Sequence, residues 1–447
     1  MQLSVLGSSL LGTVTATGLA HLGHDVLLYA ESTVRAAALR SGDAAGSEPE
    51  LGRALVNLID AGQIRIETDL PRTVLHCSLI FLAPPCETAE DSLHQRVARV
   101  LASDGTHRTL VNLETAPIGA TDALDTTLRH AGLVTGFDYD LVALPHFFSE
   151  GSALAGFLHP DRVVIGTASV PAARQMTRLF APLAAQGCPL VVMSPRAAEL
   201  TKSAANAFLA MKISFMNEVA ALCQRLGADV EDVRLGLGPD PRIGRSYLRP
   251  GIGFGGAGLA RDLTSLIDTA HAHHLQFDVL EPVLEVNRQQ PQRFLARLRR
   301  LLGTFEGKHI AVWGLAYKPD TADVCDAPAH AVVRCLLAEG ASVSVYDPEA
   351  TSATYAIFGE DIAYAETQYH ALRDADALIV CTEWPHFRRL DVARMHALMR
   401  RPVLLDGRNL YDPRRMADQG FTYLSVGRPT LRPMDRLVAG KGVAGVA

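Results

Sequence analysis

Short apolar runs alternate with longer stretches of helical spacing along the chain, and this order predicts strands separated by helices. In the first part of the chain the predicted strands are residues 2–6, 26–29, 64–68, 79–83, 109–113, 141–144 and 163–166. Strands that alternate with helices indicate a parallel α/β sheet with right-handed connections. Because such sheets bind ligands at the carboxyl ends of their strands, we expect Ser9, Thr115, His146 and Glu150 to lie along one edge.

A second set of predicted strands begins after Gly307, at residues 309–313, 342–346, 377–381 and 403–405. Long helical stretches precede it, at residues 196–226 and from about residue 278 towards residue 302. A chain of 447 residues is also too long for a single core. We therefore predict an α/β fold with two Rossmann-like parallel-sheet domains, residues 1–190 and 304–447, joined by a long-helix region at residues 191–303.

The segment G-S-S-L-L-G at residues 7–12 links the first predicted strand to a helix, as at the start of a dinucleotide-binding domain. Its outer glycines suit a tight turn and close helix packing, whereas the middle position is Ser9. The acid expected at the end of the second strand comes one residue late, as Glu31. We predict that NAD, or alternatively NADP, contacts Gly7, Ser9, Leu10, Gly12 and Glu31. A turn without a cofactor is the other interpretation.

Five glycines fall within eight residues of the stretch P-G-I-G-F-G-G-A-G-L-A-R-D at residues 250–262. This density excludes the interior of a helix or strand, so we predict a loop with a helix beginning near its end. A helix N-terminus flanked by small residues suits an anionic or polar ligand. The stretch is thus either a ligand-facing loop or a glycine-rich connector.

Lys202 and Asn206 are four residues apart in the predicted helix at residues 196–226 and so share a face. Their neighbours are mostly Ala, Phe, Ile and Met, which predicts a buried face. A buried Lys and Asn need polar partners, which indicates a site, although a lysine that extends to solvent would also fit.

The overall composition limits the classes of partner. The chain is 48% hydrophobic and 20% charged, with a net charge of −6 and no basic run interleaved with aromatic residues, which argues against nucleic acid. No apolar run is long enough to span a membrane. The seven cysteines are scattered and odd in number, which favours a reduced, cytoplasmic compartment. We expect no metal site.

Several segments together resemble the UDP-glucose/GDP-mannose dehydrogenase family. They are E-G-S-A-L-A-G-F-L-H-P-D-R-V-V-I-G (150–166), E-L-T-K-S-A-A-N-A-F-L-A-M-K-I-S-F-M-N-E (199–218), D-P-R-I-G (240–244), P-G-I-G-F-G-G (250–256), G-L-A-Y-K-P-D-T-A-D (314–323), T-E-W-P-H-F (382–387) and D-G-R-N-L-Y-D-P (406–413). They occur in order across essentially the whole chain.

The resemblance implies an oxidoreductase that uses NAD to oxidise the C6 alcohol of a nucleotide-linked sugar, such as a UDP-hexose. It implies a homodimer through the central helices, with the nucleotide on the second sheet. The implied catalytic residues are Lys202, Asn206, Asp262, Thr115 and His146. Cofactor contacts would include Thr115 and Lys318, and substrate contacts Phe147, Glu150, Lys202, Asn206, Arg242, Tyr247, Gly255, Lys318 and Arg408. For Asp262, favouring a helix N-terminus is a simpler alternative role.

The chain departs from the family pattern at the catalytic cysteine, where it carries Gly258, and at a glutamate, where it carries His146. A thiolate is needed to trap the intermediate aldehyde as a thiohemiacetal and oxidise it to a thioester. We therefore expect a two-electron alcohol–aldehyde step. The alternatives are an inactive paralogue that binds a nucleotide sugar or pairs with an active relative, and an ordinary UDP-glucose 6-dehydrogenase that works without the cysteine.

Overall fold

The computed structural model describes residues 1–43, 48–84, 91–114 and 117–433. Thr115, predicted to be a catalytic residue and to contact the cofactor, lies outside the described residues. The chain forms two compact units, Met1–Ala205 and Asn206–Ala447. Among the described residues, no helix has the length and apolar character needed to cross a membrane.

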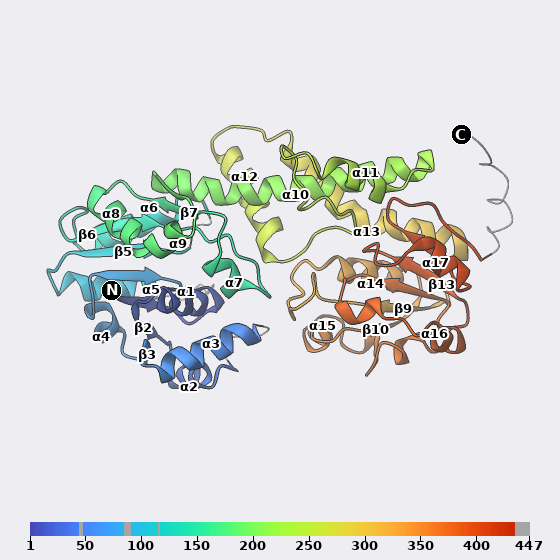
Figure 1. The fold of residues 1–447 in the computed structure, drawn as a ribbon, viewed down its shortest axis with the longest axis horizontal. Helices are drawn as coiled ribbons and strands as arrows, with labels where there is room; N and C mark the ends of the chain where they lie inside the picture. Colours follow the sequence, from blue (N-terminus) through green and yellow to red (C-terminus); the bar gives the residue numbers. More distant parts are fainter. Residues whose placement is uncertain (44–47, 85–90, 115–116, 434–447) are drawn as a thin grey trace. The chain divides into compact units, whose positions relative to one another are not determined.

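The first unit is built on a sheet with the strand order β3-β2-β1-β4-β5-β6-β7-β8 (Figure 1). Its strands are β1 (Gln2–Leu6), β2 (Asp25–Tyr29), β3 (Ile64–Glu67), β4 (Leu79–Leu82), β5 (Arg108–Asn112), β6 (Tyr139–Ala143), β7 (Val163–Gly166) and β8 (Leu190–Met193). Its helices are α1 (Leu10–His21), α2 (Thr33–Ser41), α3 (Pro49–Asp60), α4 (Leu70–Leu75), α5 (Leu93–Ala102), α6 (Ala120–His130), α7 (Ala153–Leu158), α8 (Val170–Leu179) and α9 (Ala181–Ala185).

Helices cover both faces of this sheet because successive strand residues point to opposite sides. Val5 packs in one apolar cluster with residues of α1, α3 and α8, whereas its neighbour Leu6 packs in another with residues of α4, α5 and α6. Both side chains are fully buried. Strands buried on both faces explain the uninterrupted apolar runs that mark them in the sequence.

One part of this sheet differs from the prediction of an all-parallel arrangement. β7 pairs with β6 in the antiparallel direction, through Ala143 and Gly166, and β8 then runs parallel to β7. The connection between β6 and β7 contains only the six-residue helix α7, which packs against α1. β7 starts at the same end of the sheet at which β6 finishes, so the chain does not cross back between these two strands.

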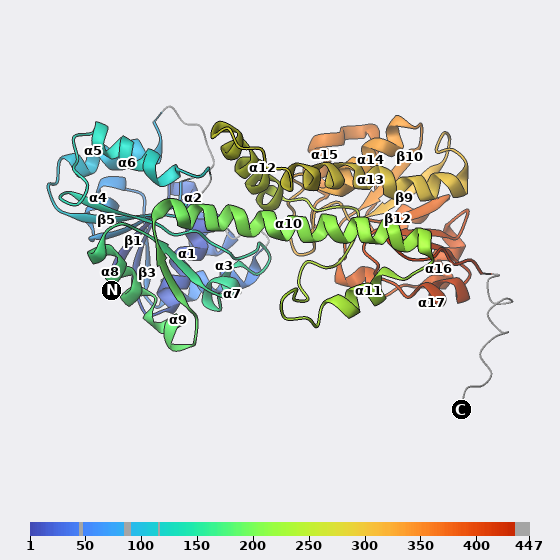
Figure 2. The same ribbon diagram turned by 90° about the horizontal axis from the view of Figure 1, so that it is seen from above.

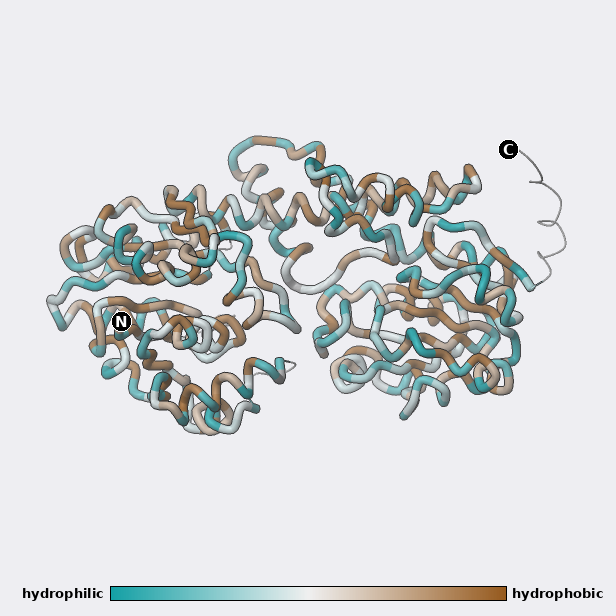
Figure 3. Tube along the Cα trace, viewed as in Figure 1, coloured by the Kyte–Doolittle hydropathy of each residue, from teal (hydrophilic) through white to brown (hydrophobic). Residues whose placement is uncertain are grey.

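The second unit has a sheet with the order β11-β10-β9-β12-β13-β14, in which every strand pair is parallel. Its strands are β9 (His309–Trp313), β10 (Ser342–Tyr346), β11 (Ala363–Tyr364), β12 (Ala377–Val380), β13 (Val403–Asp406) and β14 (Thr422–Ser425). In Figure 3 the strands of this sheet are mostly apolar, and together they form one core. The predicted fold class, two Rossmann-like α/β sheets with long helices between them in the sequence, is confirmed.

The long helices are α10 (Pro195–Leu226), α12 (Ala257–Ala272) and α13 (Leu280–Leu302), with α11 (Val230–Leu237) between α10 and α12. Figure 2 shows α10 as one continuous helix. The helices around the second sheet are α14 (Pro328–Ala338), α15 (Thr351–Phe358), α16 (Val392–Leu398) and α17 (Pro413–Asp418). Helix α12 begins at Ala257, so Gly258 and Asp262 belong to the helix and not to the preceding loop.

Three strands were not predicted, namely β8, β11 and β14, and each lies at the edge of its sheet. β11 has only two residues, and β8 is partly exposed. β14 has the sequence T-Y-L-S, which lacks an apolar run. The two-residue β11 is too short to give a pattern, whereas β8, with the sequence L-V-V-M, is an apolar run that the strand prediction omitted.

Candidate active site

The glycine turn after β1 is as tight as the sequence predicts. Gly7 has φ +118°, and a Cβ at this position would lie 2.0 Å from the carbonyl oxygen of Ala83. A Cβ at Gly12 would lie 2.0 Å from the carbonyl oxygen of Gly7. Ser9 is the N-cap of α1 and accepts a hydrogen bond from the Gly12 N–H at 3.4 Å, and Leu10 is the first residue of the helix. The turn therefore brings a helix N-terminus close to the end of β1.

Glu31 extends from the end of β2 to the same turn. Its carboxylate accepts hydrogen bonds from the Ser8 N–H, at 2.9 Å, and from the Ser8 hydroxyl. An acid at this place suits a ribose hydroxyl, and the helix N-terminus suits a pyrophosphate. The residues present thus fit a dinucleotide. Arg35 also donates to Ser8 Oγ, at 3.1 Å, and an arginine here would also be compatible with the 2′-phosphate of NADP.

The segment after β6 carries His146, Phe147 and Glu150, all half-buried. The Phe147 ring lies 3.9 Å from the Arg162 guanidinium carbon and 5.5 Å from Lys202 Nζ, so two cations face one ring. The His146 ring lies 4.8 Å from that of Phe148. These aromatic side chains line a cavity of about 130 Å³ within the first unit.

Glu48 holds the segment around Glu150 in place, although the sequence did not single it out. Its buried carboxylate accepts hydrogen bonds from the backbone N–H groups of Gly151 and Ala153, at the start of α7. A carboxylate at a helix N-terminus is stabilised by the free N–H groups there. The contact joins residues more than 100 positions apart, and no local pattern reveals such a pair.

In the second unit, Asn206 and Asp262 form a direct pair. Asn206 Nδ2 donates to Asp262 Oδ2 at 2.6 Å, and Asp262 is 2% exposed. Lys202 precedes Asn206 by one helical turn along α10, and both side chains are half-buried. Asp262 also lies one turn after Gly258 in α12. Along the face of α10 that carries Lys202 and Asn206, Ile213 is half-buried and Asn217 is buried. Phe208 and Phe215 are both 57% exposed, but at 100° per residue they lie on the opposite side of the helix.

Three glycines of the glycine-rich loop are required by close packing. A Cβ at Gly255 would lie 2.5 Å from the carbonyl oxygen of Asp326, and one at Gly256 would lie 2.7 Å from the Tyr317 ring. Gly253 has φ +114°, and a Cβ at this position would lie 2.8 Å from Asn287 Oδ1. Neighbouring residues of the same unit therefore leave no room for a side chain at these three positions.

Gly258 is different. It is exposed, and a Cβ built on it meets no atom within 4 Å among the described residues. It has ordinary helical backbone in the first turn of α12. Neither backbone conformation nor packing therefore requires a glycine at this position.

Side-chain amides of α10 and α13 fix the backbone of the loop. Asn217 accepts from the Gly251 N–H at 2.8 Å, and Gln290 donates to the Gly251 carbonyl at 2.8 Å. Asn287 accepts from the Phe254 N–H at 2.8 Å and donates to its carbonyl at 3.0 Å. Sequence reasoning missed these residues, although an Asn and a Gln three apart on a partly apolar helix are a usable signal.

The loops at the carboxyl ends of the second sheet bring together other predicted substrate residues. Arg408 donates to the carbonyl oxygens of Cys381, at 2.7 Å, and Tyr317, at 3.3 Å, and lies 3.1 Å from a Glu383 carboxylate oxygen. Lys318 Nζ lies 5.6 Å from the Tyr317 ring centre. These side chains lie beside the glycine-rich loop, since a Cβ at Gly251 would be 3.3 Å from the Arg408 guanidinium.

Arg242 and Tyr247 lie on the segment between α11 and α12. Arg242 is exposed and forms an ion pair with Asp240 at 2.7 Å. Tyr247 has φ +62°, a left-handed conformation that is unfavourable for a bulky residue. The structure does not test the predicted roles of Arg242 and Tyr247, nor those of the other predicted site residues.

Position 258 carries no thiol, and the described cysteines of the second unit include Cys223 and Cys325. Cys223, on α10, is buried, and burial raises the pKa of its thiol, which disfavours the reactive thiolate. Cys325 is exposed, and its backbone carbonyl accepts from the Gly256 N–H at 2.8 Å.

The chain is similar throughout to known nucleotide-sugar dehydrogenases. Residues 1–184, 196–289 and 311–413 match the family models for the NAD binding domain, the central domain and the UDP binding domain of the UDP-glucose/GDP-mannose dehydrogenase family. The UDP-glucose 6-dehydrogenase of Pseudomonas aeruginosa is 37% identical, over 96% of this chain and 98% of the relative. UDP-glucose 6-dehydrogenase TuaD of Bacillus subtilis is 34% identical, over 98% of this chain and 96% of the relative.

Solved structures agree with these matches. A UDP-glucose dehydrogenase from the archaeon Pyrobaculum islandicum has a TM-score of 0.85 and 34% identity, over 96% of this chain and 98% of that one. The NAD binding domain supports the predicted cofactor, NAD. The chain therefore belongs to the UDP-glucose/GDP-mannose dehydrogenase family and is an enzyme of the NAD-dependent nucleotide-sugar dehydrogenase type.

Proposed function

We propose that this protein oxidises the C6 alcohol of a UDP-linked hexose to the aldehyde by a single hydride transfer. The observation that carries the proposal is Gly258, a position in the first turn of α12 that has room for a side chain and lacks one. UDP-glucose is the preferred hexose derivative because relatives 37% and 34% identical are named UDP-glucose 6-dehydrogenases. The match to a UDP binding domain supports the nucleotide.

The reaction converts R–CH2OH and NAD⁺ into R–CHO, NADH and a proton. Bound NAD supplies the acceptor for the hydride that leaves C6. The residues of the chain then have to remove the hydroxyl proton and stabilise the charge that develops on the oxygen.

Asp262 is the proposed proton acceptor, directly or through an ordered water molecule. Its Oδ2 is held by Asn206, which fixes the direction of the carboxylate. The Arg261 guanidinium lies 3.9 Å from the other oxygen and is 60% exposed, so this ion pair is weak. Lys202 supplies a positive charge that would stabilise the developing alkoxide. Phe147, below the Lys202 ammonium, restricts the positions that it can adopt.

Complete oxidation to the acid needs a second step in which a thiolate adds to the aldehyde. The thiohemiacetal then loses a hydride to give a thioester, which water cleaves. Gly258 has no atom that can form this bond. A cysteine there would fit without steric conflict among the described residues and would lie at a helix N-terminus, which lowers the pKa of a thiol.

The test compares wild-type protein with Gly258→Cys and Gly258→Ser, which differ in one atom. Each is incubated with UDP-glucose and NAD, and NADH is measured together with aldehyde and acid by mass spectrometry. We expect one equivalent of NADH and the aldehyde from the wild type and the serine variant. We expect UDP-glucuronate only from the cysteine variant. UDP-glucuronate from the wild type contradicts the proposal, and loss of that product in Cys325→Ser would then identify a different thiol.

The second candidate is a non-catalytic paralogue that binds a nucleotide sugar or pairs with an active relative. It is favoured by the joint presence of Gly258 and His146 at positions where the family resemblance implies Cys and Glu. In that case UDP-glucose would raise the unfolding temperature, whereas neither wild type nor Gly258→Cys would form NADH.

A homodimer through the central helices is part of the proposal. Phe208, Phe215 and Leu222 recur every seven residues along α10 and are 55–57% exposed in the single chain. An apolar stripe of this spacing is typical of a helix that packs against another helix. Analytical ultracentrifugation is expected to give a dimer for the wild type and a monomer for Phe215→Glu. A monomeric wild type would contradict this part.

A further inference from the structure

A large basic cleft lies within the second unit, and its lining includes no residue of the glycine-rich loop and no predicted substrate residue. It has a volume of about 1060 Å³ and is formed by the last turns of α10, by α13 and by the segment after β14. One acid, Glu218, lines it among the described residues, against six arginines. These are Arg225, Arg293, Arg297, Arg300, Arg428 and Arg432.

Helix geometry gathers three of the arginines on one side. Arg293, Arg297 and Arg300 are spaced by four and then three residues on α13, so they share one helical face. Arg299, between them in sequence, faces elsewhere and forms an ion pair with Glu339. The positive face of α13 therefore results from the spacing of its arginines, and in the folded protein this face lines one side of the cleft.

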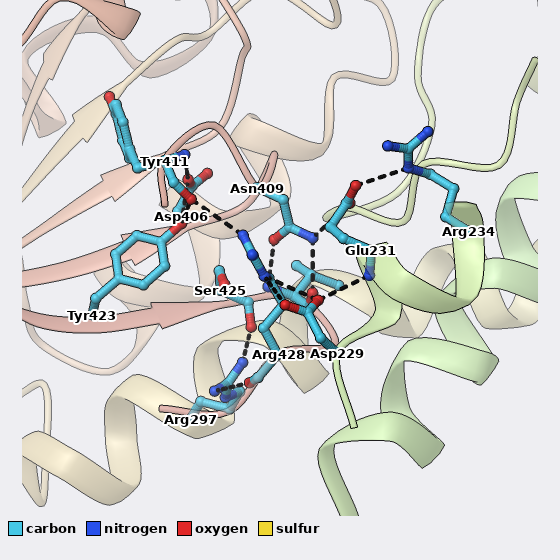
Figure 4. A network of polar contacts seen from close by, with 11 residues as sticks. Asp229, Glu231, Arg234, Arg297, Asp406, Asn409, Tyr411, Tyr423, Ser425 and Arg428 are labelled. Carbon is cyan, nitrogen blue, oxygen red and sulfur yellow. Dashed lines mark hydrogen bonds and ion pairs between the residues drawn. The ribbon is translucent and has the colours of Figure 1, made fainter. Parts of the chain in front are cut away.

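Arg297 is the most confined of these side chains. It donates to the carbonyl oxygens of Ser425 and of Arg428, at 3.2 Å in the latter case, and to Thr430 Oγ1 at 2.9 Å (Figure 4). No carboxylate lies within 4 Å of it among the described residues. Burial, with a smaller repulsion from Arg300, lowers the pKa of Arg297 to about 10. Its charge is thus met by neutral oxygen atoms only.

The other arginines differ in how far their charge is compensated. Arg428 forms an ion pair with Asp229 at 3.0 Å, as Figure 4 shows. Arg293 donates to Gln289 and Arg300 to the Ala296 carbonyl, which are both neutral. Across the described part of the chain, Arg225, Arg293 and Arg300 have no acidic partner within ion-pair distance, so with Arg297 four positive charges remain uncompensated.

We propose that this cleft is a second anion site, which binds a small molecule with two or more phosphate groups, such as a nucleoside diphosphate or triphosphate. Several guanidinium groups directed into one cavity match the charge and bidentate geometry of phosphate oxygens. Leu222, Leu301 and Leu424 also line the cleft and suit the less polar part of a nucleotide. The volume exceeds that needed by inorganic phosphate alone.

The main rival occupant is a second copy of the chain. Leu222 belongs both to the cleft and to the exposed stripe of α10, so a dimer formed through that stripe would border the site. An acidic segment of the partner could then neutralise the arginines. The experiment has to separate this outcome from phosphate binding.

Isothermal titration of the full chain with inorganic triphosphate and with ATP tests the proposal. The cleft variant is Arg293→Gln/Arg300→Gln, in which two exposed side chains lose charge at similar length. The control is Arg288→Gln/Arg389→Gln, also exposed, in the same unit and outside the cleft. Arg408→Ala, a change in the proposed substrate site, separates the two sites.

We expect the wild type to bind triphosphate and ATP, with affinity that falls as salt rises. The cleft variant should bind at least about tenfold more weakly because it loses two charge-assisted contacts, while the control and Arg408→Ala bind as the wild type does. No binding to the wild type overturns the proposal, as does equal weakening in the control. Loss in Arg408→Ala would assign binding to the substrate site. A cleft variant that loses only self-association would assign the cleft to a second copy.

Discussion

Gly256 and Gly258 are two residues apart, but the structure predicts opposite results when each is replaced by alanine. Gly256 has φ +82°, which costs an L-residue about 1–2 kcal/mol. The new Cβ would also lie 2.7 Å from the Tyr317 ring, and displacing a packed side chain costs about 1–3 kcal/mol. Gly256→Ala should therefore lower the free energy of unfolding by about 2–5 kcal/mol.

Gly258→Ala is the matched control for this change. Its Cβ meets no described atom within 4 Å, and the residue lies in the first turn of α12. Alanine is favoured over glycine inside a helix by up to about 1 kcal/mol, so we expect no loss of stability. Gly255→Ala would separate steric conflict from backbone strain, because its Cβ meets the Asp326 carbonyl at 2.5 Å although its φ is ordinary.

Urea unfolding followed by tryptophan fluorescence measures the stability of the unit that holds the glycine-rich loop. Trp313 and Trp384 are the two tryptophans of the chain, and both are buried in the unit that holds the loop. With an m-value of about 2–3 kcal/mol per molar urea, Gly256→Ala should lower the midpoint by about 0.7–2.5 M. Equal midpoints for Gly256→Ala and Gly258→Ala would refute the loop packing described above.

Three further outcomes are expected. His330 is 3% exposed, and burial lowers its pKa to about 4. Because this histidine binds a proton near pH 6.5 in the unfolded chain but not in the folded one, about 2 kcal/mol of stability should be lost between pH 6.5 and 5. Urea unfolding should show a smaller loss over this pH range in His330→Gln. Asn287→Ala leaves the Phe254 N–H and carbonyl without their hydrogen bonds and should cost about 2–4 kcal/mol by the same assay. Asp262→Asn keeps an acceptor for Asn206 but loses the base, so NADH formation should fall by about 10²- to 10⁴-fold with an unchanged urea midpoint.

The central strands and the glycine turn could be predicted because their signals are local. A strand buried on both faces is marked by an apolar run such as residues 79–82, and Gly12 is required by a contact with Gly7 in the turn itself. The spacing of Lys202 and Asn206 on one helix is also a local property. The edge strand β8 was not predicted, although its sequence, L-V-V-M, is an apolar run of four residues.

The orientation of β7 could not be predicted, because it depends on where the chain travels after β6. The short helix α7 packs on α1 and keeps the chain at one edge of the sheet. Glu48, which caps α7, comes from a separate part of the unit. Sequence patterns record which residues are apolar, but they do not record which distant backbone groups a side chain will reach.

The sequence by itself determined the family and the two α/β sheets, since these depend on residue identity and short-range spacing. Only the tertiary structure decided which glycines the fold requires. Gly255 is required by Asp326, about 70 positions away, whereas Gly258 has free space around it among the described residues. The same holds for the arginine cleft, whose charges come from three separate segments and become one site only when the fold brings them together.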